Sequence, residues 1–63
     1  MSASTEGLTY EEIRAIERRS KASLALQVTG WARENDVFFD SPPSGWSKDE
    51  LVSYVCKIED GRA

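Results

Sequence analysis

The side chains that could carry out catalysis in this chain are mainly carboxylates, because its 63 residues include 11 acidic groups and no histidine. Without histidine, a serine or cysteine nucleophile lacks its usual general base. Two neighbouring acidic pairs, Glu11–Glu12 and Asp49–Glu50, have the residue types that acid–base catalysis needs. Both pairs fall in the first turn of a predicted helix, where the helix dipole favours negative charge. We therefore interpret them as parts of helix ends and predict that the protein is not an enzyme.

The sequence offers no recognisable site for a metal ion or a cofactor. Its single cysteine, Cys56, cannot form a disulfide within the chain, and a zinc site needs several thiolate or imidazole ligands. We predict that Cys56 is a small, largely buried apolar residue. A phosphate-binding loop needs several glycines before a helix, whereas only Gly45 takes such a position inside the predicted domain. We expect neither a metal ion nor a cofactor.

Basic side chains in the first third of the chain form a candidate binding surface. Arg14, Arg18 and Lys21 of the predicted first helix lie within about 60° of one another around its axis. Such a stripe could bind an acidic protein surface or nucleic-acid phosphates. The alternative is that these side chains are solvated, with Arg14 paired to Glu11 and Lys21 to Glu17 along the helix.

Helix starts are marked twice by the same motif. Thr9 precedes Glu12, and Ser47 precedes Glu50, by three residues, and each hydroxyl residue follows an apolar one. This spacing is typical of a capping box with a hydrophobic staple, in which hydroxyl and carboxylate satisfy the first backbone N–H groups. It predicts helices that begin just after Thr9 and Ser47. The second helix should end just before a left-handed turn at Gly61.

A helical pattern of apolar residues extends from Thr9 to about residue 35. One straight helix over this segment would be about 39 Å long, whereas a compact chain of this size has a diameter of about 27 Å. Either the helix breaks, with Ser20 or Ser23 capping a new segment, or it stays long and a second copy of the chain covers its exposed side. A weaker apolar stripe on that side also requires a partner. This stripe consists of Ala15, Ala22 and Leu26.

The segment before the last helix combines aromatic residues with the dipeptide Pro42–Pro43. Two consecutive prolines predict an extended path without helix. Phe38, Phe39 and Trp46 flank this loop, so we expect the loop to be held at both ends and its aromatic rings to belong to the core. If Phe38 or Trp31 were exposed instead, the ring would be a candidate anchor for a partner.

These patterns together predict an all-α protein, a small domain of two or three helices with an aromatic-bounded Pro-Pro loop before the last helix. We expect one domain over residues 8–61, preceded by a flexible tail over residues 1–7. The sequence shows neither an apolar run long enough to span a membrane nor a signal peptide, which favours a cytoplasmic protein. Its net charge of −3 disfavours general nucleic-acid binding.

Residues 25–58 resemble the helix–extended-loop–helix domains of the SAP, HeH and Rho-N type. The likeness lies in a helix, an extended loop and a second helix that opens with Ser47-Lys48-Asp49-Glu50-Leu51-Val52. The resemblance implies a module that contacts DNA or RNA. The residues that it would bring to the nucleic-acid backbone are Ser44, Gly45, Ser47 and Lys48. The last helix of this chain departs from the resemblance, because it carries more acidic than basic residues.

Size and patterning favour a small non-enzymatic regulator or adaptor that acts by binding a protein partner. The candidate contact residues are Arg14, Arg18, Lys21, Leu26 and Phe38. Two alternatives remain open. One is a nucleic-acid-binding helix–extended-loop–helix module, and the other is a homo-oligomeric structural or assembly protein, such as a dimer, that pairs through the long first helix.

Overall fold

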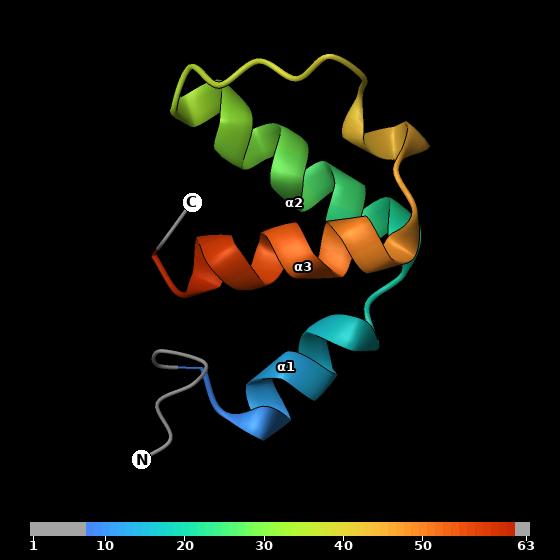
Figure 1. Cartoon of the computed structure of the whole chain (residues 1–63), viewed down its shortest axis with the longest axis vertical. Coiled ribbons are helices and arrows are strands. Elements are labelled where there is room, and N and C mark those ends of the chain that lie inside the picture. Colours follow the sequence, from blue (N-terminus) through green and yellow to red (C-terminus); the bar gives the residue numbers. More distant parts are fainter. Residues whose placement is uncertain (1–7, 62–63) are drawn as a thin grey trace.

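The computed structural model describes residues 8–61, and the tail predicted for residues 1–7 lies outside this range. Its elements are α1 (Tyr10–Glu17), α2 (Lys21–Glu34), a turn of 3-10 helix named η2 (Pro43–Gly45) and α3 (Lys48–Glu59). The described residues are thus all-helical, as predicted, and none of them lies in a β-strand. Figure 1 shows α3 between α1 and α2, and both of these helices contact it.

Capping boxes begin α1 and α3, as predicted. Thr9 Oγ1 accepts a hydrogen bond from Glu12 N at 3.1 Å, and Glu12 Oε1 accepts one from Thr9 N at 2.8 Å. Ser47 and Glu50 form the same pair of bonds, at 3.2 and 3.1 Å. The two glutamates therefore satisfy backbone donors at helix ends. Gly61 follows α3 with φ at +80°, the left-handed conformation expected there.

The long helical pattern is interrupted between α1 and α2, so the first of the two predicted alternatives is correct. Ser20 has an extended backbone (φ −68°, ψ 156°), and its Oγ accepts a hydrogen bond from Ser23 N at 3.1 Å. Ser20 therefore caps α2 and turns the chain, so that Ile16 and Leu24 join the same core. The hypothesis of a dimer that pairs through one long first helix assumed a helix that the described residues do not form.

A small apolar core holds the helices together. Leu24, Val28 and Ala32 of α2 follow a four-residue spacing, and so do Leu51 and Val55 of α3. Such spacing places each set on one side of its helix. The complete set of buried apolar residues in the described chain is Ile16, Leu24, Ala25, Val28, Ala32, Leu51 and Val55, with Pro43 also buried. Ile16 is the one member of this set that α1 supplies. The packing of α1 against the other helices therefore depends on a small contact area.

An aromatic cluster holds the loop between α2 and α3. The ring centroid of Tyr54 lies 5.6 Å from that of Trp31, 5.5 Å from that of Phe39 and 5.7 Å from that of Trp46, all in edge-to-face geometry. Phe39 and Trp46 are also in contact, at 4.9 Å. Trp46 Nε1 donates a hydrogen bond to the carbonyl oxygen of Ser41 at 3.2 Å. The prediction that aromatic rings hold the loop is confirmed for Phe39 and Trp46.

The two prolines of the loop adopt different structures. Pro42 is extended (φ −67°, ψ 143°), as predicted, whereas Pro43 begins η2. The prediction of a loop without helix is wrong at this point. The first position of a helix tolerates proline, because the backbone N–H that proline lacks would have no partner there. Hydrogen bonds from Gly45 N to Pro42 O, at 2.9 Å, and from Trp46 N to Pro43 O, at 3.0 Å, close the turn.

A polar cluster connects the α1–α2 connection with α2 and with the last residue of α3. Arg19, between α1 and α2, donates a hydrogen bond to Gln27 Oε1 of α2 and lies 3.7 Å from Glu59 Oε2 of α3. Gln27 Nε2 donates a hydrogen bond to the same carboxylate oxygen at 2.9 Å. This cluster fixes the short α1–α2 connection against the end of α3.

Candidate functional site

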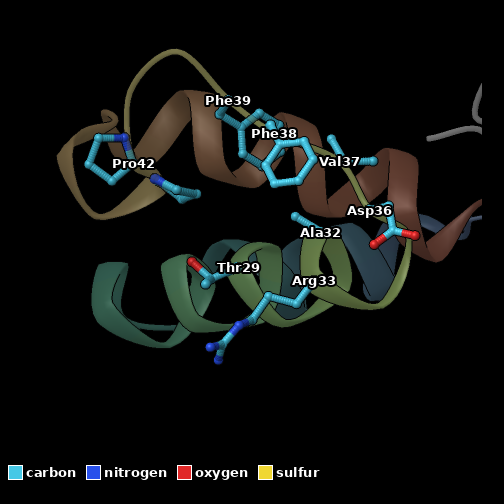
Figure 2. Close-up of a pocket in the computed structure, with 9 residues that line it drawn as sticks. Thr29, Ala32, Arg33, Asp36, Val37, Phe38, Phe39 and Pro42 are labelled. Atoms are coloured by element: carbon cyan, nitrogen blue, oxygen red, sulfur yellow. The ribbon is translucent and has the colours of Figure 1, made fainter.

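The end of α2 determines where the loop goes. Asp36 has φ at +55°, in the left-handed region that glycine usually occupies after a helix. Val37 N then donates a hydrogen bond to Ala32 O at 2.9 Å, which is one of the two bonds of a Schellman motif. The chain therefore reverses, and residues 37–43 return along α2 as an arm that faces it across a hollow (Figure 2).

Residues 37–39 belong to neither a helix nor a strand, and their side chains differ in exposure. Val37 and Phe39 are half-buried, whereas Phe38 between them is 91% exposed. The expectation that the loop's aromatic rings belong to the core is therefore wrong for Phe38. Phe39 packs against the core, whereas Phe38 makes no ring contact within residues 8–61. Phe38 meets the condition set for a candidate partner anchor, and Trp31, which contacts Tyr54, is half-buried.

A hollow lies between the second half of α2 and the returning loop (Figure 2). It has a volume of about 420 Å³. Thr29, Ala32 and Arg33 line it from α2, and Phe38 lies at its rim. The other lining residues are Asp36, Val37, Phe39, Pro42 and Pro43. Most of these side chains are apolar, so the hollow suits an apolar group.

A second hollow adjoins the first along α2. It has a volume of about 510 Å³ and is lined by Lys21, Ala22, Ala25, Leu26, Thr29 and Ser44. Thr29 lines both hollows, so the two adjoin at this residue. Leu26 is 73% exposed in the second hollow, and Phe38 stands over the first. We call these two adjoining hollows, with their lining residues, the α2–loop surface.

Exposed large apolar side chains in the described chain are Tyr10, Leu26 and Phe38. Tyr10 has a partner, because its hydroxyl accepts a hydrogen bond from Arg14 Nη1 at 3.0 Å and the guanidinium lies 5.4 Å from its ring centroid. Within residues 8–61, no comparable interaction involves Leu26 or Phe38. Both belong to the α2–loop surface, so the unexplained apolar exposure is concentrated in one place.

The predicted basic stripe is divided by the break between the first two helices. Arg14 and Arg18 line a separate hollow with Tyr10 and Glu11, whereas Lys21 belongs to the α2–loop surface. Lys21 begins a different helix from the one that carries Arg14, so the predicted alignment with Arg14 does not hold for Lys21. Among the described residues, neither of the ion pairs predicted along the helix forms. Arg14 contacts Tyr10 instead.

The residues singled out by the helix–extended-loop–helix resemblance lie at η2 and the start of α3. Ser44, Gly45, Ser47 and Lys48 are all exposed. Ser47 is already used in the cap, since its hydroxyl accepts a hydrogen bond from Glu50 N. The acidic side chains of Asp49 and Glu50 follow directly. Negative charge at this position opposes contact with phosphates.

Cys56 is half-buried rather than largely buried. Burial raises the pKa of its thiol, and the carboxylates of Glu17 and Glu59 raise this pKa further, while Arg19 opposes them. Such a thiol is a poor nucleophile at neutral pH. The described residues contain no group of three or more acidic, cysteine or histidine side chains arranged to hold a metal ion. Within the same range, no helix has the length and apolar character needed to cross a membrane.

Thr29 and Arg33 of the α2–loop surface were not predicted from the sequence, and neither was a role for Gly30, which adjoins Thr29 in the chain. Gly30 is exposed in the interior of α2. The available signal was the four-residue spacing of Ala22, Leu26 and Gly30, which continues the weaker apolar stripe beyond Leu26. Glycine in a helix interior costs about 0.5–1 kcal/mol relative to alanine, so its presence there needs a reason.

Comparison of the chain with protein-family models, with curated proteins and with solved structures found no match.

Proposed function

We propose that this protein is a non-enzymatic regulator or adaptor that acts by binding another protein through the α2–loop surface. The observation that carries the proposal is the exposure of Leu26 and Phe38 beside two adjoining apolar hollows. Partner-binding sites concentrate their energy in a few large apolar or aromatic side chains beside such hollows. Phe38 supplies the aromatic anchor and Leu26 the aliphatic one.

The way in which Phe38 is held supports this role. Its two neighbours are held, Val37 by the hydrogen bond to Ala32 and Phe39 by contacts with Trp46 and Tyr54. The backbone at residue 38 is therefore fixed before any partner arrives. A partner that buries the ring loses little loop entropy on binding, which favours affinity.

The predicted contact residues contribute unequally to this proposal. Leu26, Phe38 and Lys21 belong to the α2–loop surface, and Arg14 and Arg18 lie on a different part of the molecule. We assign the primary contact to the first three. Arg14 and Arg18 would take part only with a partner that also reaches α1.

Affinity capture from a lysate of the source cells tests the proposal, with the full chain immobilised and bound proteins quantified by mass spectrometry. The test variants are Leu26→Gln and Phe38→Gln, and the matched control is Tyr10→Gln, which removes an equally exposed apolar side chain from α1. Because all three positions are exposed, each variant should fold, as circular dichroism would verify.

The expected result is one dominant protein that is retained by the unmodified chain and by Tyr10→Gln. Its recovery should fall at least tenfold with Leu26→Gln and with Phe38→Gln. Equal recovery with all variants would refute the α2–loop surface as the binding site. Recovery of no specific protein would refute the proposed function.

A further inference from the structure

Gly30 lies on the exposed side of α2. Within the described residues, no neighbouring atom would prevent a larger side chain at this position. A Cβ atom at this position would meet nothing within 4 Å, and its φ lies outside the left-handed region. Replacement by alanine should therefore stabilise the free protein. The distance between two packed helices depends on the side chains at their contact. A glycine at position 30 would therefore allow the backbone of a partner to approach α2 closely.

Ala22, Leu26 and Gly30 follow one another at four-residue intervals in α2. Residues with this spacing form a continuous row on a helix surface. A large side chain here stands between two small ones, so a second helix can place its own side chains over Ala22 and Gly30 on either side of Leu26. The row lies beside the hollows of the α2–loop surface, and Ala22 and Leu26 line one of them.

A helix fits the α2–loop surface better than an extended peptide does. Extended peptides gain affinity mainly by pairing with a sheet edge, and none of residues 8–61 forms a strand. A helix satisfies its own backbone groups and needs only side-chain contacts. From Lys21 to Arg33 the surface follows about 18 Å of α2, at 1.5 Å per residue, which a partner helix of about 12 residues would cover.

The ends of this surface are cationic. Lys21 stands at one end and Arg33 at the other, and neither forms an ion pair within residues 8–61. Asp36 also lines the hollow beside Arg33, so the α2–loop surface carries two positive charges and one negative charge. This surface is therefore net positive, although the whole chain has a net charge of −3. Acidic residues near both ends of a partner helix would complement them. A second copy is disfavoured, because two α2 helices would bring their cationic ends together in either direction.

We infer that the α2–loop surface binds an amphipathic α-helix of a different protein, which lies along α2, contacts Gly30 closely and carries acidic residues at both ends. This inference rests on the proposed function and specifies the chemistry of the partner. Leu26 and Phe38 are the apolar anchors, and Lys21 and Arg33 determine the charge preference.

A displayed library of 15-residue amphipathic helices, selected on the full chain, tests the inference. The apolar face and both ends of the helix are randomised, and an enriched peptide is then synthesised and its Kd measured by fluorescence anisotropy. Gly30→Gln is the decisive variant, because glutamine favours a helix but prevents close approach. Ser53→Gln makes a similar change on the exposed side of α3 and is the matched control.

We expect enriched peptides to carry Asp or Glu at both ends. Gly30→Gln should raise the urea midpoint of unfolding and yet weaken peptide binding at least tenfold, whereas Ser53→Gln should leave the Kd unchanged. Enrichment of basic or uncharged ends, or equal affinity of both variants, would overturn the inference. Self-association of the chain that Leu26→Gln abolishes would also overturn it, in favour of a second copy.

The two proposals can fail separately. If affinity capture yields a Phe38-dependent protein but no helical peptide binds, the helix inference is wrong and the proposed function stands. If capture yields no Phe38-dependent protein and no peptide binds, both are wrong.

Discussion

Phe38 and Phe39 are neighbours in the chain, but only Phe39 packs against other aromatic rings. The ring of Phe39 lies edge-on against those of Trp46 and Tyr54, at 4.9 and 5.5 Å between centroids, while Phe38 is 91% exposed. One side chain thus fixes the loop to the core and the other is presented to solvent. This division of roles links the stability of the loop to the proposed binding surface.

Replacement of each phenylalanine by alanine should therefore have different effects. Phe39→Ala removes a half-buried ring with two aromatic contacts and should lower the free energy of unfolding by about 2–4 kcal/mol. Phe38→Ala should change it by less than about 0.5 kcal/mol, as is usual for an exposed position. Urea unfolding followed by tryptophan fluorescence measures both, and similar losses would contradict the assigned orientations.

Asp36 should be a place where the protein can be stabilised. Its φ of +55° strains a residue with a Cβ atom, whereas glycine adopts this conformation readily. Asp36→Gly should raise the free energy of unfolding by about 0.5–1 kcal/mol. Thermal and urea unfolding would show the gain, with Asp40→Gly in the following loop as a control. A loss of stability in Asp36→Gly would mean that the left-handed turn has been assigned wrongly.

Arg19 should contribute more to stability than the adjacent Arg18. Its side chain contacts Gln27 and Glu59 at once, so Arg19→Ala should cost about 0.5–1.5 kcal/mol of unfolding free energy. Arg18→Ala should cost little, because Arg18 is exposed. A double-mutant cycle with Glu59→Gln should give a coupling energy that shrinks in 1 M salt. No coupling at low salt would contradict the role of this cluster.

The Cys56 thiol should react slowly near neutral pH. Burial raises its pKa in the folded protein, and Glu17 and Glu59 raise it further, so the thiolate fraction is lower than in the unfolded chain. The rate of alkylation by iodoacetamide as a function of pH should have a higher midpoint in buffer than in urea. Glu17→Gln should move the folded midpoint downward. A folded midpoint at or below the unfolded one would disprove this environment.

Helix ends were predictable because the responsible interactions are local. Thr9, Ser20 and Ser47 each cap a helix through a backbone N–H three residues away, so sequence spacing contains most of the information. The spacing could not choose between Ser20 and Ser23 as the cap after the break. That choice depends on the core, which requires Ile16 and Leu24 to face α3 together.

The α2–loop surface was only partly predictable because it depends on tertiary structure. Leu26 was identified from helical periodicity, which does not change when the chain folds. Phe38 could not be distinguished from Phe39 by residue type, since the left-handed turn at Asp36 determines which ring faces the core. Lys21 was assigned to a stripe with Arg14 that assumed a continuous helix, and the break at Ser20 separates the two.

Photo-cross-linking would show whether Phe38 and Leu26 of the α2–loop surface contact one and the same partner protein. Benzoylphenylalanine would replace Phe38, Leu26 or Tyr10, one position at a time, and cross-linked products would be identified by mass spectrometry after irradiation in cells. We predict that one and the same foreign protein is cross-linked from positions 38 and 26 but not from position 10, and that Gly30→Gln abolishes the product. Equal cross-linking from all three positions, or a product containing two copies of this chain, would show that the α2–loop surface does not bind a different protein.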